Sequence, residues 1–187
     1  MSMSRFRIFT VMMVASGIGF LLIGCNEDPA VSGRSSEDDH DVVALLPEDL
    51  LLAEMPADPT PITRLKQIAK EGDEVVMRVI IGGRERPFVE NRAIMTVIDA
   101  SLNNQCKLAS HGCKTPWDYC CESPERIKAN LATVQIVGDE GWPLAVNLTR
   151  ALKIEPMALL VVRGKVAPRP DPSVLIVNAS GLFVAHP

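Results

Sequence analysis

Four cysteines fall within one stretch of sixteen residues, CKLASHGCKTPWDYCC, which runs from Cys106 to Cys121. The stretch also carries a histidine and two aromatic residues, in a chain with an aromatic content of only 4%. Thiols at this density do chemistry of three kinds: they form disulfides, bind soft metal ions, or act as redox centres. The spacing, C-x₆-C-x₆-C-C, is the first guide to which one applies.

The redox and haem alternatives lack their motifs. A thioredoxin-like centre uses C-x-x-C and covalent haem uses C-x-x-C-H, and neither is present. Structural zinc typically uses cysteines two to four residues apart, and the adjacent Cys120 and Cys121 fit poorly on one tetrahedral ion. His111 can replace one thiol, so a site for zinc or copper(I) stays open as the alternative. Its ligands would come from Cys106, His111, Cys113, Cys120 and Cys121.

Two disulfides are the leading interpretation of this stretch. An exported chain meets an oxidising environment, and four cysteines are an even number. A bond between Cys120 and Cys121 would close a strained ring, so we expect Cys106 to pair with one of them and Cys113 with the other. Closing loops of this length contributes about 2–4 kcal/mol for each bond. The bonds would order an insertion over residues 102–131, because a loop this long needs support.

The export prediction comes from the amino terminus. Two arginines precede an uncharged, mostly apolar run from Ile8 to Gly24, which is short for a spanning helix and typical of a secretory signal. Residues Leu22 to Cys25 resemble the lipobox of bacterial lipoproteins. That resemblance implies a signal peptide over residues 1–24 and attachment of acyl chains, such as palmitate, to Cys25. The mature chain would be anchored in a bacterial membrane and face the periplasm or the exterior. A plain amino-terminal membrane anchor is the alternative.

Residues 25–60 predict an acidic tether. Positions 26–60 hold ten carboxylates against one arginine, a pattern typical of a solvated linker. Within it, DVVALLPEDLLLAEM is apolar enough to form a short amphipathic helix or to lie against the folded domain, and disorder is the third possibility. A short helix is predicted over 61–72, with Thr60 as its N-cap. The net charge of the whole chain, −4, neither requires nor excludes an anionic partner.

Residues 73–187 predict a mostly β domain. Five runs are rich in β-branched residues and have glycine, proline or aspartate at their ends. Most connections are too short for a crossover helix, so we expect an antiparallel sheet. The runs cover residues 74–83, 93–101, 132–139, 159–167 and 173–184. The pattern of residues 143–153 fits a further strand or a helix.

The order of these runs resembles an oligonucleotide/oligosaccharide-binding (OB) fold. GDEVVMRVIIGG looks like its first strand, AIMTVIDASL and ATVQIVG like the second and third, and ALLVVRGKV with VLIVNASGLFV like the closing pair. Gly164 fits a position where a barrel strand bends sharply. The resemblance implies a five-stranded antiparallel Greek-key barrel with the cysteines inserted between strands two and three. A plain antiparallel sandwich is the alternative.

The whole chain, with its lipobox and TPWDYCC, also resembles small lipoproteins of planctomycete bacteria. That resemblance implies a cellular location and no activity.

Residue patterns for catalysis are missing. The sequence has no G-x-S-x-G, S-x-x-K or H-E-x-x-H. Its three histidines, His40, His111 and His186, lie in the linker, the cysteine stretch and the carboxyl end. We therefore expect no enzymatic turnover and no cofactor.

A binding or accessory role in the cell envelope is the functional prediction, with a metal-binding or redox-related protein as the alternative. The loop after the first strand carries Arg84, Arg86, Phe88 and Arg92, and by the resemblance this loop flanks a ligand groove. Arginines around one aromatic ring suit an anionic small molecule, a glycan or a peptide carboxylate. The same arginines are also typical of a solvated loop.

Trp117 and Tyr119 add two aromatic rings within the cysteine stretch. They predict either a platform on which a ligand stacks or a small core of the loop itself. Nucleic acid is disfavoured as a partner, because stacking on single strands needs aromatic residues on the sheet and the second and third strands have none.

Overall fold

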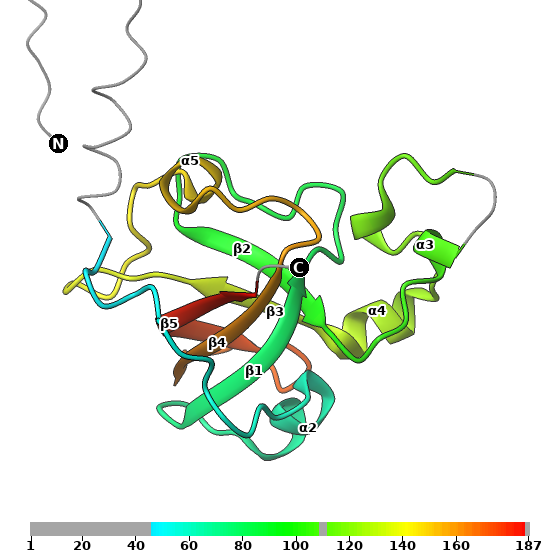
Figure 1. Cartoon of the computed structure of the whole chain (residues 1–187). Coiled ribbons are helices and arrows are strands. Elements are labelled where there is room, and N and C mark those ends of the chain that lie inside the picture. Colours follow the sequence, from blue (N-terminus) through cyan, green and yellow to red (C-terminus); the bar gives the residue numbers. More distant parts are fainter. Residues whose placement is uncertain (1–45, 109–111, 186–187) are drawn as a thin grey trace, which may run out of the picture. The chain divides into compact units, whose positions relative to one another are not determined.

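The computed structural model describes residues 46–108 and 112–185, and within them a mostly β fold is confirmed. Five strands form a closed barrel (Figure 1). They are β1 (Glu74–Ile81), β2 (Ile94–Asp99), β3 (Leu131–Gln135), β4 (Leu159–Val166) and β5 (Ile176–Ala185). The strands lie where β-branched residues were expected, with ends that differ by a few positions. The signal peptide, Cys25 and most of the acidic tether lie outside the described residues.

The helices are short and lie between the strands. They are α2 (Ile62–Ile68), α3 (Gln105–Leu108), the 3₁₀ turn η1 (Pro116–Asp118), α4 (Pro124–Asn130) and α5 (Leu148–Leu152). Helix α2 confirms the short helix predicted ahead of the barrel. Residues 143–153, whose pattern fitted a strand or a helix, contain helix α5. The side chain of Asn147 caps its amino-terminal end. No helix among the described residues has the length and apolar character needed to cross a membrane.

The strand order around the barrel is β1-β2-β3-β5-β4, and β4 pairs with β1 to close it. The prediction of an entirely antiparallel sheet is wrong at one place, because β3 and β5 run parallel. The reason is geometric: strands in a ring of five cannot alternate in direction all the way round. The long connection of residues 136–158 carries the chain from β3 across to β4, and the hairpin to β5 then returns beside β3.

Alternate side chains of the strands fill the barrel. In β1 the residues Val75, Met77, Val79 and Ile81 are all buried, as the two-residue period predicted. The register of β4 and β5 shifts between Arg163 and Gly164. A Cβ atom at Gly164 would lie 2.3 Å from the carbonyl oxygen of Asn178, so this predicted bend requires glycine.

The end of the predicted tether belongs to the barrel. Leu46 and Leu50 are buried in the main core. The amide of Leu52 donates to the carbonyl of Leu182 over 2.9 Å, and the amide of Leu182 donates to Leu50. Among the three possibilities left open for this stretch, its described part lies against the folded domain without forming a helix.

Candidate metal centre in the cysteine segment

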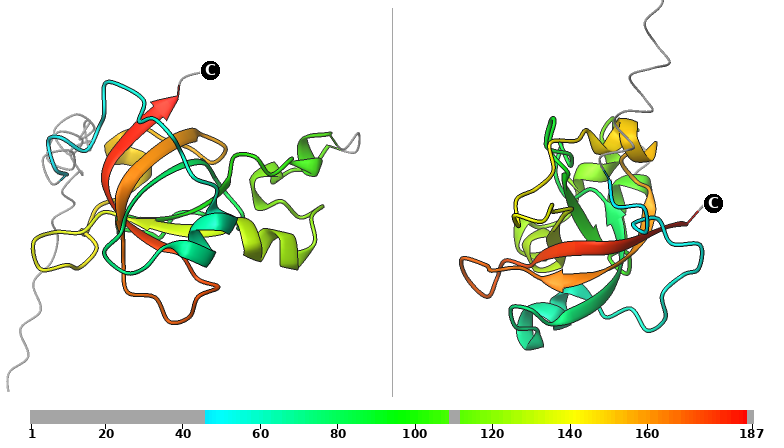
Figure 2. Two further views of the ribbon diagram at one scale, coloured as in Figure 1. Left: turned by 90° about the horizontal axis from the view of Figure 1, so that it is seen from below. Right: turned by 90° about the vertical axis from the view of Figure 1, so that its left-hand side faces the viewer.

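The four clustered cysteines lie between β2 and β3, in residues 100–130, which we call the cysteine segment. It contains α3, η1 and α4 and lies at one side of the barrel (Figures 1 and 2). A second, small apolar cluster joins it to the barrel, in which Tyr119 and Leu102 pack with Ile98 of β2. The segment therefore rests on the outer surface of the barrel wall.

A tight turn in TPWDYCC positions Cys120. The carboxylate of Asp118 accepts a hydrogen bond from the Thr115 hydroxyl at 2.8 Å and one from the Cys120 amide at 2.8 Å. Tyr119 adopts a left-handed backbone conformation with φ 59°. This reversal lets the Tyr119 ring be completely buried while the next residue, Cys120, is exposed.

Trp117 fastens the turn to the loop that follows β1. Its carbonyl accepts a hydrogen bond from the Gly83 amide at 2.7 Å, and its indole Nε1 donates to the Glu85 carbonyl at 2.9 Å. A Cβ atom at Gly82 would lie only 2.5 Å from the Trp117 carbonyl oxygen. The Gly82-Gly83 pair thus serves a close backbone approach.

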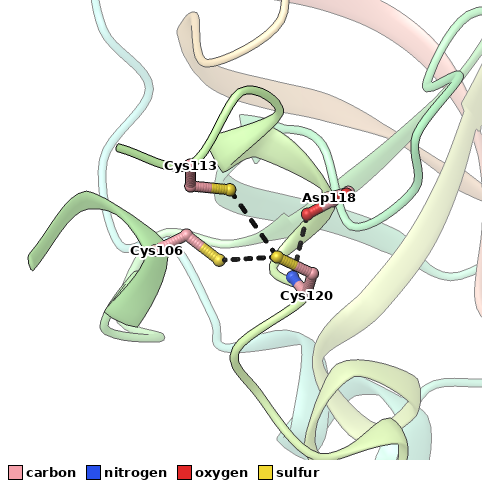
Figure 3. Close-up of side chains that lie close together, drawn as sticks. All are labelled: Cys106, Cys113, Asp118 and Cys120. Carbon is pink, nitrogen blue, oxygen red and sulfur yellow. Dashed lines mark hydrogen bonds between the residues drawn. The ribbon is translucent and has the colours of Figure 1, made fainter. Parts of the chain in front are cut away.

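The thiols converge on the sulfur of Cys120 (Figure 3). Its Sγ lies 3.5 Å from that of Cys106, 3.6 Å from that of Cys113 and 4.0 Å from that of Cys121. Ligand atoms of Cys106, Cys113, Cys120 and Asp118 all lie within 4.8 Å of one another. One compact cluster is formed by side chains from α3, the turn and the residues between them.

The predicted disulfides are not formed in this structure. All four cysteines are free thiols, and a bonded pair of sulfurs would be about 2.05 Å apart. Both predicted pairings assign Cys120 to one partner, Cys106 or Cys113. Instead its sulfur lies at nearly equal distances from both. A shared arrangement of this kind was not anticipated, because sequence spacing does not reveal how α3 and the turn approach each other.

Hydrogen bonds favour the thiolate of Cys106. Burial acts to raise the pKa of this thiol, but the hydrogen bonds from Cys121, Cys120 and Cys113 outweigh it and the net shift of the pKa is downward. The Cys121 amide donates to the Cys106 Sγ at 3.3 Å. The pKa of Cys120 is raised, with the hydrogen bond to Cys106 as the largest cause. The hydrogen bonds of the cluster therefore favour deprotonation of Cys106 over deprotonation of Cys120.

The sulfur spacing suits a single thiophilic cation. With a Zn–S distance of about 2.3 Å, the edge of a tetrahedron of sulfurs is about 3.8 Å. The three distances from Cys120 lie on either side of this value. The fourth position has two candidates: the carboxylate of Asp118, which belongs to the compact group but already accepts two hydrogen bonds, and the sulfur of Cys121, which lies 4.0 Å from that of Cys120. His111 lies outside the described residues.

The residues of the predicted groove are dispersed. Phe88 is half-buried and packs against the main core, while Arg92 reaches the carbonyl of Pro143 at 3.5 Å. Arg86 is exposed on the loop. Arg84 alone of the four lines a pocket beside β3 and α4. Tyr119 has no exposed face on which a ligand would stack.

Two lysines that the sequence interpretation did not single out lie beside Arg84. Lys66 of α2 and Lys128 of α4 line the same pocket. The only signal available for them was positive charge, which is common on helices.

Comparison of the chain with known protein families, with curated proteins and with solved structures finds no match.

Proposed function

We propose that this chain is a non-enzymatic protein of the bacterial envelope, tethered by lipid at Cys25, whose barrel carries a thiolate metal centre. The observation that carries the proposal is the sulfur of Cys120, which lies 3.5–4.0 Å from three other sulfurs. The hydrogen bonds between these thiols are weak, so they account for such convergence only in part. A cation bound at the centre would stabilise it.

The ligand set favours a soft d¹⁰ ion. Thiolates select zinc or copper(I) over harder divalent cations. We assign zinc, with Cys106, Cys113, Cys120 and Cys121 as ligands, because the three distances from the Cys120 sulfur lie close to the edge of a tetrahedron of sulfurs and both oxygens of Asp118 are engaged in the turn. Cys106 is buried, and the Cys121 amide already donates a hydrogen bond to its sulfur. Copper(I) bound by the three closest sulfurs is the competing outcome, and metal analysis distinguishes the two.

A site closed by four thiolates supports a structural role. Catalytic zinc keeps one position for water or substrate, whereas structural zinc has four protein ligands. Metal bonds would also explain how a segment with few buried side chains keeps its turns. Turnover is therefore not part of the proposal.

We infer further that the barrel is of the OB type and that the cysteine segment is an insertion into it. The support is the strand order β1-β2-β3-β5-β4 with its single parallel pair, and the position of α5 between β3 and β4. The family usually has a helix at that position, where the residue pattern alone left a strand or a helix open. A simple sandwich has no closing pair such as β1 with β4.

Mass spectrometry of the protein purified from membranes tests the proposed lipid anchor. The mature amino-terminal residue is expected to be a diacyl- or triacyl-glyceryl Cys25. An intact leader in the purified protein would contradict the lipid anchor and leave the plain membrane anchor as the explanation.

The metal centre is tested on exported protein purified without reductant or chelator. We expect about one zinc per chain and four thiols that become titratable after denaturation with a chelator. Cys113→Ala should lower the zinc affinity at least tenfold, while Lys114→Ala, an exposed neighbour, should not. Cys121→Ser and Asp118→Asn identify the fourth ligand. Absence of metal together with no titratable thiols would restore the two disulfides and contradict the proposal.

A further inference from the structure

A pocket of about 440 Å³ opens between α4 of the cysteine segment, α2, β3 and the loop that precedes β5. Its volume is within the range of about 300–1,000 Å³ that is usual for small-molecule sites. The metal centre does not line it. Any ligand of this pocket would therefore be recognised by residues other than the four cysteines.

One wall of the pocket is apolar. Ile127 of α4 and Leu131 of β3 face it together with Val174 and Leu175 from the loop before β5. Leu175 is almost fully buried, whereas the other three are half-buried and keep part of their surface in contact with solvent. An apolar ligand body would remove this surface from water, which favours binding.

The pocket also carries positive charge, which comes from three separate parts of the chain. Lys66 lies on α2, Arg84 follows β1 and Lys128 lies on α4, and all three line the pocket. The Lys66 ammonium donates to the Lys128 carbonyl at 2.6 Å, which holds the two helices side by side. Among the described residues the ion pair is between Arg126 and Glu122, so none of the three cations has a salt-bridge partner there.

The electrostatic effects on Lys66 agree with this picture. Burial lowers the pKa of Lys66, and the charge of Lys128 lowers it further. Asp171 acts in the other direction on Lys66, and Arg169 partly offsets Asp171. Arg169 itself is occupied, since its guanidinium donates to the Ala69 carbonyl at 2.7 Å. The balance at the pocket is positive, and an anion would relieve the repulsion between the lysines.

We propose that this pocket binds a small amphipathic anion: an aliphatic body on the wall of Ile127, Leu131 and Val174, and a carboxylate head between Lys66, Lys128 and Arg84. Neither feature would be sufficient by itself. An apolar wall accepts many uncharged ligands, and a group of three cations alone binds many anions weakly. Their combination in one pocket of limited volume selects a ligand that carries both. A medium-chain monocarboxylate has this chemistry and a compatible size.

The proposal is independent of the metal, and its test keeps the two apart. Exported protein of verified zinc content is titrated with sodium decanoate by isothermal calorimetry, below the concentration at which decanoate forms micelles. We expect saturable one-site binding. Decanol and inorganic phosphate should each bind at least tenfold more weakly, because each supplies only one of the two features.

Variants locate the site. Lys66→Met together with Lys128→Met should weaken decanoate binding at least tenfold, since methionine keeps the apolar stem and removes the charge. Lys165→Met on β4 is the matched control, because Lys165 is exposed and does not line the pocket. Each variant is checked for an unchanged melting temperature. Absence of saturable binding, equal binding of decanol or of phosphate, or unchanged affinity in the double variant would overturn the proposal.

Discussion

The barrel and the cysteine segment differ in how much side-chain surface they bury. Every strand of the barrel contributes apolar residues to one main core, including four from β1 alone. Within residues 100–106 and 112–130 of the cysteine segment, the buried side chains are those of Leu102, Cys106, Tyr119 and Glu122. The barrel can therefore be stable through burial, whereas the segment depends on one aromatic anchor, on hydrogen bonds of its turn, and on the proposed metal. Loss of the proposed metal should therefore affect local stability in the cysteine segment more than in the barrel.

The largest loss of stability is expected from a substitution within the barrel. Gly164→Val places side-chain atoms against the Asn178 carbonyl and the Val177 side chain, at the bend between β4 and β5. We expect the free energy of unfolding to fall by about 3 kcal/mol or more, since the clash is with backbone and cannot be relieved by a rotamer change. Urea denaturation followed by circular dichroism measures it.

The control for this variant is Gly141→Ala, where no atom lies within 4 Å of the new Cβ. Its positive φ of 79° should cost only about 1 kcal/mol. Equal losses of stability in the two variants would show that close packing at the bend is not what requires Gly164.

A second prediction concerns the joint between β2 and α2. Asp99 is buried, and its carboxylate accepts hydrogen bonds from the Ile62 amide at 2.7 Å and from the Ser101 hydroxyl at 2.6 Å. Asp99→Ala leaves the first amide of α2 without a partner and should destabilise the fold by about 2–3 kcal/mol. Asp139→Ala, an exposed acid in a turn, is the matched control for the loss of one carboxylate. A loss below about 0.5 kcal/mol for Asp99→Ala would contradict this joint.

Gly164 and Asp99 show which features of the fold could be predicted from the sequence and which could not. Alternating apolar residues were enough to locate the five strands, and Gly164 was recognised as a bend. The cap of α2 was expected from Thr60, yet the structure supplies it from Asp99, which is distant in sequence. The parallel pair of β3 and β5 follows from closing a ring of five strands, a consequence that the prediction of an antiparallel barrel did not take into account.

The candidate site was predicted in part for a similar reason. Local spacing identified Cys106, Cys113, Cys120 and Cys121 as one group, and the structure brings them together. The spacing was interpreted as disulfides, because ligands two to four residues apart are the usual mark of zinc. Here the thiols converge through the turn that the hydrogen bonds of Asp118 hold. No sequence motif predicts those hydrogen bonds. The pocket cations come from three elements and are adjacent only after folding.

The third prediction tests the aromatic anchor of the segment. Burial raises the pKa of Tyr119 from 10.0 to about 12. Between pH 10 and 12 the unfolded chain has lost this proton while the folded chain keeps it, so stability falls as the pH rises. Two pKa units correspond to about 2–3 kcal/mol as an upper value. Chemical denaturation at pH 9 and pH 11.5 measures the loss.

Tyr119→Phe keeps the ring and removes the titrating hydroxyl, so its stability should change less between these two pH values. The same alkaline loss in wild type and in Tyr119→Phe would show that other groups cause it and that Tyr119 is not a titrating anchor.

The smallest effect on the whole fold is expected from removal of the metal. A chelator should reduce amide protection in residues 112–130 at least tenfold, because their turns lose the metal bonds, and leave β1 and β4 protected. Hydrogen exchange with mass spectrometry resolves the two regions. Cys106→Ala, already without a complete site, should show no further change on chelation. Loss of protection throughout the barrel would mean that the two regions are not separable.

X-ray absorption at the zinc edge of exported protein tests the thiolate centre most directly. We expect a shell of sulfur atoms at about 2.3 Å, with four sulfurs for each zinc in the native chain and fewer in Cys120→Ala. The result that would contradict it is a chain without bound metal, or zinc surrounded only by nitrogen and oxygen at about 2.0–2.1 Å.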